Sequence, residues 1–403
     1  MAPVDAVSRL VGAAMAGIEE HALSSARVGD LAASLGVSDR HLRRVTESEL
    51  GVSPIELAQT QRLLLAKRLL RETSLTLTDI AFASGFGSVR RFNALFKSRY
   101  ALSPRAIRGR TIDTDTLSVQ LEFRPPLAWK SLLAYLRLRA IPGVEMADET
   151  HYRRTVAIGA AKGWIAVSMH PGNGALNLEI SPPLTPAIGA VIGRVKQLFD
   201  LGAAPDSVRA VLRHDEILAA TVRRLPGLRV AGAFDGFELA VRTVLGQQIS
   251  VKGASTLAGR WAQTFGEPIA TPYVQLNRVS PTAERTAAVA AGEIAALGMV
   301  GSRAHCVAGL AQAVSQRKIV LAFASNVEAQ IESLMSLPGI GHWTANYIAM
   351  RALHWPDAFP TGDLVLMRAA GANQRQLQQR SEAWRPWRAY AAHYLWQSLG
   401  VAP

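Results

Sequence analysis

The stretch "SLPGIGHWTANYIAMRALHWPDAFPTGDLVLMRAAG" (residues 336–371) places a short glycine-rich turn between two runs that are typical of helices. The turn, "LPGIG", follows the apolar segment "VEAQIESLMS" and precedes "HWTANYIAMRAL". Gly339 and Gly341 allow positive φ and leave the backbone open. The first N–H groups of the following helix have no intrahelical partner, so a phosphate can bind them without any side chain. The pentapeptide by itself is equally compatible with a plain turn between helices.

A lone carboxylate, Asp363, follows Pro360-Thr361-Gly362 in the same stretch, which otherwise holds only one other acid, Asp357. Asp363 stands where a helix is expected to start, and the commonest role of an Asp at such a position is to cap the helix. The combination of turn and acid, rather than either feature alone, points to chemistry.

Composition bounds the class of protein. The chain has 403 residues, of which 49% are hydrophobic, enough for several packed domains. Its formal net charge of +13 indicates a polyanionic partner such as nucleic acid, with a solvated basic surface as the alternative. The excess is local, since residues 71–110 carry 8 basic and 2 acidic side chains while residues 1–70 carry 8 of each. We interpret this basic block as a binding face.

Several classes are disfavoured. The single cysteine, Cys306, excludes a disulfide framework, a Cys-rich zinc site and a four-Cys iron–sulfur cluster within this chain. The N-terminus lacks the pattern of a signal peptide, and no apolar run is long enough for a membrane helix. We therefore expect a cytoplasmic protein with no bound metal.

Residues 1–110 are expected to be helical only, and they contain an internal repeat: "LAASLGVSDRHLRRVTESELGVSP" (31–54) aligns with "IAFASGFGSVRRFNALFKSRYALSP" (80–104). Each copy predicts a helix, a glycine turn and a second helix that begins with basic residues, which is the helix-turn-helix pattern. A helix over 55–72 joins the copies. The pair resembles the AraC-type DNA-binding domain, and this resemblance implies that promoter DNA is bound. The expected contact residues are Arg40, Arg43, Arg90 and Arg91.

A polar link, "GRTIDTDTLSV" (109–119), leads into segments of alternating hydrophobicity at 117–123, 155–160, 164–170 and 175–181. Lys162-Gly163 and Gly172-Asn173-Gly174 are expected to form turns between strands of an antiparallel sheet. A helix over 186–203 should cover one face, and the pattern from about 205 onward is helical. The predicted fold is mainly α and multidomain. It comprises a double helix-turn-helix (1–110), a small antiparallel α+β domain (111–204) and an all-α domain (205–403).

The LPGIG turn followed by Asp363 resembles the helix-hairpin-helix DNA glycosylase superfamily. The resemblance implies that Leu337, Gly339 and Gly341 hold a DNA phosphate, while Asp363 is the catalytic residue and faces the anomeric carbon of a flipped nucleotide. Breaking the N-glycosidic bond develops positive charge on the sugar, which a carboxylate can stabilise. No paired general acid is needed when the base is already cationic, because an N-alkylated purine leaves as a neutral molecule.

Trp343 separates the subclasses of this superfamily. In bifunctional members the residue two past the hairpin's last glycine is a lysine that forms a Schiff base with the sugar. Trp343 therefore favours the monofunctional AlkA-type glycosylases, which excise alkylated purines such as 3-methyladenine and 7-methylguanine; this resemblance covers roughly residues 117–400. Its implied base pocket consists of aromatic faces that attract a cationic base, although core packing is the alternative for each one alone. The pocket residues are Trp343, Tyr347, Trp396 and Tyr135.

The segment "AVRTVLGQQISVKGAS" (240–255) matches the family's wedge, and Leu245 is expected to fill the gap left by the flipped nucleotide. No cofactor is implied, apart from a monovalent cation that the hairpin backbone can hold. Two positions depart from the family, because Gly362-Asp363 replaces a pair of acids and Leu364 replaces an aromatic residue that often follows. These departures leave the lesion range open.

The order of domains resembles alkylation-response proteins of the Ada kind without their zinc methyl-acceptor domain, which either has been lost or precedes the start of this chain. We expect a nucleoid-associated bacterial base-excision-repair glycosylase that acts on alkylated double-stranded DNA and carries a sequence-specific regulator domain. The alternative is an alkylation-responsive transcription regulator whose C-terminal half only recognises lesions. A glycosylase with lyase activity conflicts with Trp343.

Overall fold

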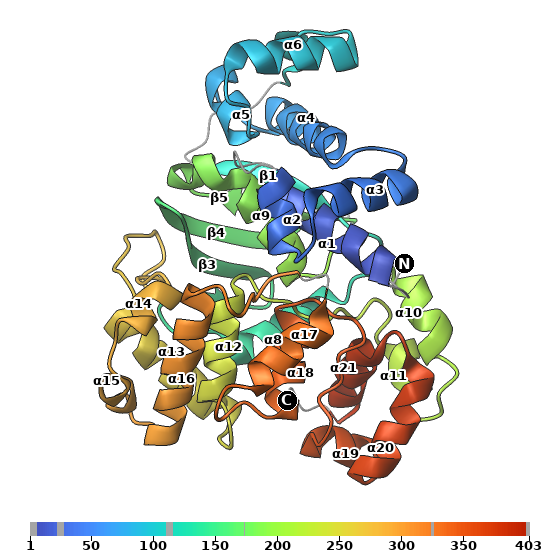
Figure 1. Ribbon diagram of the computed structural model, residues 1–403, viewed down its shortest axis with the longest axis vertical. Coiled ribbons are helices and arrows are strands. Elements are labelled where there is room, and N and C mark those ends of the chain that lie inside the picture. The colour runs from blue at the N-terminus through green and yellow to red at the C-terminus, as the bar shows by residue number, and fades with distance from the viewer. Residues whose placement is uncertain (1–5, 22–27, 110–115, 173, 324–325, 400–403) are drawn as a thin grey trace. The chain divides into compact units, whose positions relative to one another are not determined.

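The computed structural model describes residues 6–21, 28–109, 116–172, 174–323 and 326–399 (Figure 1). The chain divides into two compact units. The N-terminal unit comprises residues 3–122 and 156–196, and the C-terminal unit comprises residues 123–155 and 197–403. The division passes through strand β3 (His151–Ile158).

The predicted repeat is present in the N-terminal unit. The turns between its paired helices contain Gly36 and Gly85 at φ of +69° and +81°, a conformation that favours glycine. Leu42 and Phe92, which match in the repeat, are both fully buried. The helices are α1 (Ala6–His21), α2 (Val28–Ser34), α3 (Asp39–Leu50), α4 (Pro54–Glu72), α5 (Leu77–Ala83), α6 (Val89–Tyr100) and α7 (Pro104–Ile107).

Ser side chains fix where these helices begin. Ser38 and Ser88 accept hydrogen bonds from the first turns of α3 and α6, so both helices start directly after the glycine turns. Ser53 caps α4 in a reciprocal pair with Glu56, and Ser103 caps α7. The duplicated helix-turn-helix prediction is confirmed.

The strands form an antiparallel five-stranded sheet in the order β1-β5-β4-β3-β2. Leu117 pairs with Ile180, and Ile180 pairs in turn with Ile165. Buried and exposed residues alternate along β1, as the sequence pattern predicts. The three-residue strand β2 was not predicted, because so short a segment shows no periodicity. The strand bounds are β1 (Leu117–Glu122), β2 (Glu145–Ala147), β3 (His151–Ile158), β4 (Ala161–Met169) and β5 (Ala175–Ile180).

One local prediction is wrong. Lys162-Gly163 lies inside β4, and the turn falls at Gly159-Ala160 instead. Gly163 serves close packing, because a Cβ there would lie 2.1 Å from Ser181 Oγ. The helix expected over 186–203 is present as α9 (Ile188–Leu198), which is shorter at both ends and follows a 3-10 segment, η1 (Pro182–Ala187). In the second predicted turn, Asn173 lies outside the described residues.

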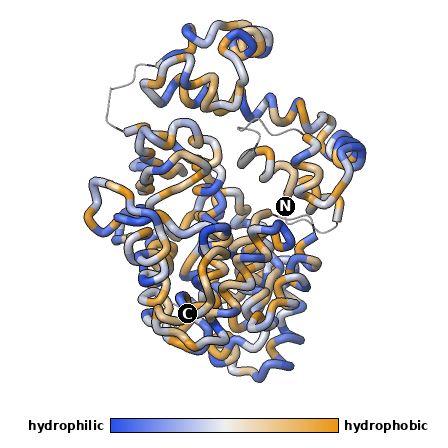
Figure 2. The backbone as a smooth tube through the Cα atoms, turned by 60° about the vertical axis from the view of Figure 1, so that its left-hand side comes forward, coloured by the Kyte–Doolittle hydropathy of each residue, from blue (hydrophilic) through white to orange (hydrophobic). Residues whose placement is uncertain are grey.

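The C-terminal unit is helical apart from β2 and part of β3. Figure 2 shows hydrophobic residues concentrated in its interior and hydrophilic ones at its periphery. No helix in the described part of the chain is long and apolar enough to cross a membrane. The helices of the C-terminal unit are α8 (Trp129–Arg139), α10 (Pro205–Leu212), α11 (Ala219–Arg224), α12 (Gly236–Leu245), α13 (Val251–Phe265), α14 (Ala283–Ala287), α15 (Ala291–Ala295), α16 (Gly301–Ser315), α17 (Val327–Met335), α18 (His342–Arg351), α19 (Leu364–Ala370), α20 (Gln374–Ser381), η2 (Glu382–Trp384) and α21 (Arg388–Ser398).

Candidate active site

The LPGIG turn joins α17 to α18 as a helical hairpin. Gly339 has φ +92° and is exposed, and a Cβ at this position would approach Cys306 Cβ to 3.1 Å. Gly341 has an ordinary φ of −91°, so only the first of the two expected glycines needs a positive φ. No side chain caps α18, and Gly341 at its N-cap is exposed. Leu337 is half-buried at the start of the turn.

The loop between α12 and α13 braces this hairpin. Gln247 Nε2 donates to the Gly339 carbonyl (2.8 Å) and to Thr344 Oγ1 (3.2 Å). Arg303, from α16, donates to the Gln247 carbonyl at 2.6 Å. The sequence shows a pair of glutamines here, but not that one of them holds the LPGIG turn in place.

Asp363 lies at the convergence of three helices. Its Oδ1 accepts from the Leu366 N–H (2.8 Å), so it is the N-cap of α19, the commonest role for such an acid. Trp343 Nε1, on α18, donates to Oδ2 at 2.9 Å, and Trp396 Nε1, on α21, lies 3.4 Å from Oδ1. The residue is 8% exposed. It is therefore a helix cap whose carboxylate is also fixed by two indoles.

The four predicted pocket aromatics lie together beside this carboxylate. Trp343 and Tyr347, one helical turn apart, stack with ring centroids 5.1 Å apart and planes inclined by 9°. Trp396 is tilted against Tyr347 at 6.3 Å. Tyr135, far away in sequence on α8, shares a hydrogen bond of 2.8 Å with Tyr347 between their hydroxyl oxygens. Sequence reasoning assigned the two Trp residues to stacking only and missed their indole hydrogen bonds to Asp363.

Three arginines lie behind the aromatic cluster, and sequence reasoning missed all of them. Arg351 Nη1 donates to Tyr347 Oη at 3.2 Å, and Arg139 lies over the Tyr135 ring at 3.8 Å. Arg242 donates to the Arg139 carbonyl at 2.8 Å. All three are more than nine-tenths buried. Arg351 stands four residues after Tyr347, so helical spacing was the one signal that could have found it.

Burial and nearby charges shift the pKa values of the two tyrosines of the cluster in opposite directions. Burial opposes ionisation of Tyr347, but Arg351, Arg139 and Arg242 outweigh it and lower its pKa to about 7. Burial raises the pKa of Tyr135 to about 12, so it stays a proton donor. His393 packs against Tyr135 and Trp396, and burial followed by the charges of Arg351 and Arg139 holds its pKa well below the usual range. Its buried Nε2 has no hydrogen-bond partner among the described residues.

The structure contradicts the wedge prediction for Leu245. Its side chain has no exposed surface and belongs to the hydrophobic core at the end of α12. A side chain buried in this way cannot enter a base stack without unfolding the end of its helix. The residues that do present side chains from this loop are Gln248, which is exposed with φ +57°, and Ile249, which is 39% exposed.

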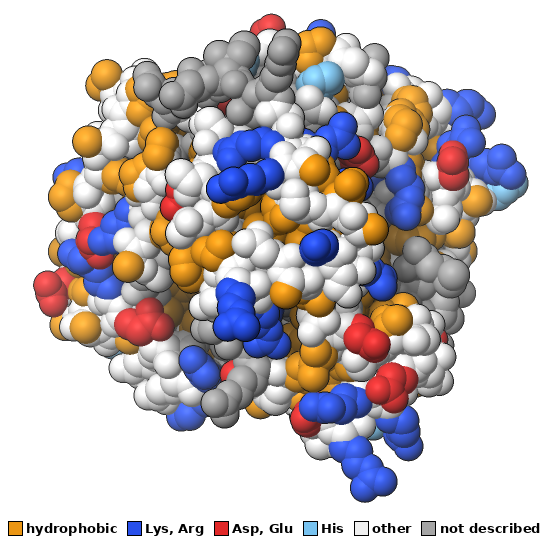
Figure 3. Space-filling model, turned by 90° about the horizontal axis from the view of Figure 1, so that it is seen from above, with side chains coloured by type: hydrophobic (Ala, Val, Ile, Leu, Met, Phe, Trp, Pro, Cys, Tyr) orange, Lys and Arg blue, Asp and Glu red, His pale blue; other side chains and the backbone are white. Residues whose placement is uncertain are grey.

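The arginines predicted for the helix-turn-helix are all exposed, Arg40 and Arg43 on α3 and Arg90 and Arg91 on α6. Arg43 also pairs with Asp39 one turn earlier at 3.0 Å. Figure 3 shows Lys and Arg side chains spread over one face of the molecule among hydrophobic surface and scattered acidic groups. These arginines are therefore available to a polyanion.

This geometry defines a class. A helical hairpin with an open turn, followed by a buried carboxylate among aromatic rings, is the arrangement of a helix-hairpin-helix glycosylase. Family models agree: residues 241–383 match the "HhH-GPD superfamily base excision DNA repair protein", 118–235 match the "AlkA N-terminal domain" and 31–110 match a "Helix-turn-helix domain". The mainly α, multidomain fold predicted from the sequence is confirmed.

Similarity to known proteins narrows the class. The chain is 34% identical to the probable bifunctional transcriptional activator/DNA repair enzyme AlkA of Mycobacterium tuberculosis, over 97% of this chain and 81% of that protein. It is also 34% identical to the DNA-3-methyladenine glycosylase 2 of Escherichia coli, over 70% of this chain and 98% of that protein. The chain therefore belongs to the AlkA family, as an AlkA-type glycosylase that carries an AraC-type helix-turn-helix domain.

A solved structure supports the fold assignment. The 3-methyladenine DNA-glycosylase from Archaeoglobus fulgidus superposes on 69% of this chain and 97% of its own, with a TM-score of 0.60 and 18% identity. At this identity the match concerns the fold alone.

Leu245→Ala is expected to lower the free energy of unfolding by about 2–5 kcal/mol, because the substitution leaves a cavity in a packed core. Thermal unfolding measures this, and base release should fall equally on intact duplexes and on duplexes whose target base is already unpaired. Gln248→Ala is the matched control, with an unchanged melting temperature and a loss confined to intact duplexes. A stable Leu245→Ala protein with that selective loss would restore the wedge assignment.

Proposed function

We propose that this protein is a monofunctional DNA glycosylase that releases alkylated purines, of the 3-methyladenine and 7-methylguanine type, from nucleoid DNA. The observation that carries the proposal is Asp363, a buried carboxylate fixed by the indoles of Trp343 and Trp396 beside an open helical hairpin. Acting on a base inside a duplex requires the nucleotide to be flipped out, and the aromatic cluster offers the faces on which such a base stacks.

Asp363 acts on the sugar. As the N-glycosidic bond lengthens, positive charge moves from the cationic base to the deoxyribose ring, and a carboxylate aimed at the anomeric carbon stabilises it. The electron pair of the breaking bond leaves with the alkylated purine, which becomes neutral. Water then adds to the anomeric carbon and gives up a proton to the solvent. The two indole N–H groups keep the carboxylate in one orientation, so no reorganisation is needed during the reaction.

The hairpin anchors the duplex. The uncapped N–H groups of α18 and the exposed backbone at Gly339 and Gly341 suit a DNA phosphate, and the same backbone can hold a monovalent cation between hairpin and phosphate. Gln248, held in the left-handed region next to the hairpin brace at Gln247, takes the wedge role that Leu245 does not have. Filling the gap in the base stack offsets part of the unstacking cost.

The N-terminal helix-turn-helix supplies a second contact with DNA. Duplicated domains of this type place two helices in the major groove, and the exposed arginines on α3 and α6 are placed for phosphates or base edges. We propose that this domain binds promoter DNA. The alternative, a regulator whose C-terminal half only recognises lesions, leaves Asp363 only its structural role as the cap of α19.

Asp363→Asn is expected to reduce base release from methylated duplex DNA by at least about a hundredfold while DNA binding is retained. The Asn side chain still caps α19, so folding should persist. Asp215→Asn is the matched control, because Asp215 also accepts from an indole (Trp384, 2.8 Å) and from backbone N–H groups. Near-normal turnover of Asp363→Asn would reduce this residue to a cap, and wild-type protein that binds lesions without releasing bases would support the regulator alternative.

No lyase activity is expected, because Trp343 occupies the position of the Schiff-base lysine. Incubation with abasic duplex DNA and borohydride should give no covalent adduct on a denaturing gel, with a bifunctional glycosylase of the same superfamily as the positive control. A trapped complex at stoichiometric yield would overturn this assignment.

The double variant Arg90→Ala/Arg91→Ala is expected to weaken duplex binding and to reduce the slope of log affinity against log salt by roughly one to two, one unit for each lost phosphate contact. Fluorescence anisotropy of the full chain on undamaged DNA measures both. Arg317→Ala/Lys318→Ala removes the same charge from exposed positions just beyond α16 and serves as the control. An equal slope in both variants would remove α6 from the DNA interface.

A further inference from the structure

The base pocket is backed by an unusual concentration of buried positive charge. Arg139, Arg242 and Arg351 are 5%, 8% and 4% exposed, and among the described residues none of them forms an ion pair with a carboxylate. Their N–H groups donate instead to neutral oxygens, including the carbonyls of Tyr135, Arg139 and Ala231. Removing three cations from water costs several kcal/mol per ion unless negative charge lies close by.

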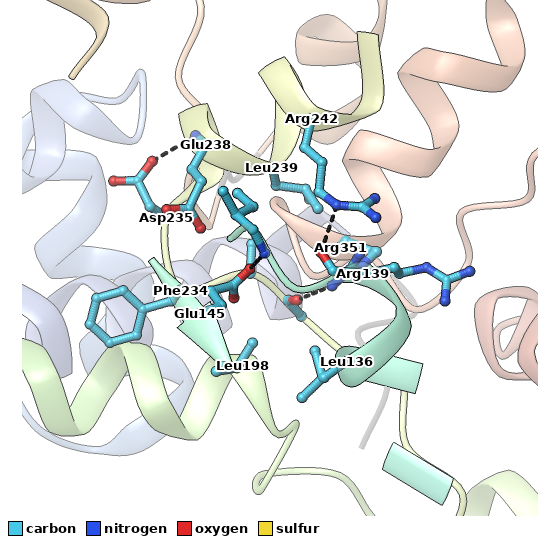
Figure 4. Close-up of a pocket in the computed structure, with 13 residues that line it drawn as sticks. Leu136, Arg139, Glu145, Leu198, Phe234, Asp235, Glu238, Leu239, Arg242 and Arg351 are labelled. Carbon is cyan, nitrogen blue, oxygen red and sulfur yellow. Dashed lines mark hydrogen bonds between the residues drawn. The ribbon is translucent and has the colours of Figure 1, made fainter. Parts of the chain in front are cut away.

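The nearest carboxylates are already engaged elsewhere. Figure 4 shows Glu145 and Glu238 on one side of a cavity of about 20 Å³ and the three arginines on the other. Glu238 makes a bidentate ion pair with Arg154 (2.8 and 3.2 Å), and Glu145 lies 3.5 Å from the same guanidinium. These acids therefore neutralise Arg154 first and leave the three pocket arginines short of a partner.

Among the described residues, the ionisable hydroxyl that accepts a hydrogen bond from the arginine cluster is that of Tyr347. Tyr347 Oη accepts from Arg351 Nη1 (3.2 Å) and shares a hydrogen bond of 2.8 Å with Tyr135 Oη. A phenolate at Tyr347 would thus accept from a guanidinium and from a phenol, both charge-assisted hydrogen bonds. We propose that Tyr347 is held as a phenolate by the three buried arginines, and that this negative charge makes Tyr347 the residue that selects positively charged bases.

The phenolate acts on the bound base through the aromatic rings of the pocket. The Tyr347 ring stacks on Trp343 and lies 6.3 Å from Trp396, and both indoles also hold Asp363. An ionised ring has a more electron-rich face than a neutral one, so it attracts a cationic base more strongly while it changes little for a neutral base. Because the positive charge stays within the site as it moves from the base to the sugar, the attraction acts on the bound base and on the transition state alike. The effect therefore falls on binding rather than on the chemical step.

The groups around Tyr347 set the direction of its pH dependence. Arg351 shares its helix, Tyr135 and Arg139 come from α8, Arg242 from α12 and neutral His393 from α21, with Asp363 beyond the indoles. The three arginines lower the pKa of Tyr347 to about 7. Since this lies below the ordinary value of 10, ionisation adds stability that is fully present above about pH 10 and is lost as the pH falls through 7.

The first test needs no DNA. The full chain is titrated through neutrality while the near-ultraviolet absorbance of tyrosinate is recorded. The wild type should ionise one of its seven tyrosines with a midpoint near 7, and Tyr347→Phe should lose that step. Tyr135→Phe, which removes a donor to the phenolate, should move the midpoint upward. Tyr390→Phe is the control and should leave the step unchanged, because burial and the neighbouring Asp200 hold its pKa well above 10.

The second test, which rests on the proposed function, compares a cationic base (7-methylguanine) with a neutral one (hypoxanthine) in duplex DNA. Tyr347→Phe should raise the KM for the cationic base about tenfold with little change in kcat, and leave the neutral base within about twofold. The wild type should show the same rise in KM for the cationic base as the pH falls below 7. Equal losses on both bases, or no tyrosine that ionises near neutrality, would overturn the proposal. A protein that titrates as expected but releases no base would instead refute the proposed function alone.

Discussion

The site depends on one carboxylate that accepts hydrogen bonds from three helices. Asp363 caps α19 through the Leu366 N–H and is reached by Trp343 from α18 and Trp396 from α21. A carboxylate that is 8% exposed is stable only where donors replace the water it has lost, so these bonds are a condition for its burial. The same bonds fix the relative positions of the three helices. The hydrogen bonds that would orient the carboxylate for catalysis are therefore the same ones that the fold requires.

Charge is layered across the aromatic cluster. On one side lies the Asp363 carboxylate, and on the other lie Arg139, Arg242 and Arg351, with Trp343 and Tyr347 stacked between them. Without a compensating anion, the arginines would repel a cationic base and so oppose the action proposed for Asp363. A phenolate at Tyr347 removes this conflict, because it places the neutralising charge in the ring against which the base would lie. The hydroxyl of Tyr135 is then needed as a donor, which explains a buried tyrosine at a position where a phenyl ring would fill the same space.

The sequence predicted those features that depend on local chemistry. Glycine turns and serine caps repeat at matching positions, so both helix-turn-helix copies could be located, and the LPGIG turn with Asp363 identified the hairpin and its acid. Features that depend on contacts distant in the sequence were missed. Gly163 was assigned to a turn because its neighbour in space, Ser181, cannot be known from the sequence. The arginine cluster and the hydrogen bond between Tyr135 and Tyr347 join α8, α12 and α18, and no periodicity within one helix reveals such a junction.

Leu245 was predicted to be the wedge but is a core residue. Its burial helps to position Gln248, the residue that we propose as the wedge. Leu245 anchors the end of α12, and the chain then leaves the helix at Gly246. Gln247 is held from both sides, through its side chain to Gly339 and through its carbonyl to Arg303. Gln248 can therefore remain in the left-handed region, which costs a residue with a side chain about 1–2 kcal/mol, because its neighbours allow no relaxed alternative. A buried leucine and a tethered glutamine thus point the next side chain outward beside the LPGIG turn, so the proposed wedge and the proposed phosphate anchor are held together.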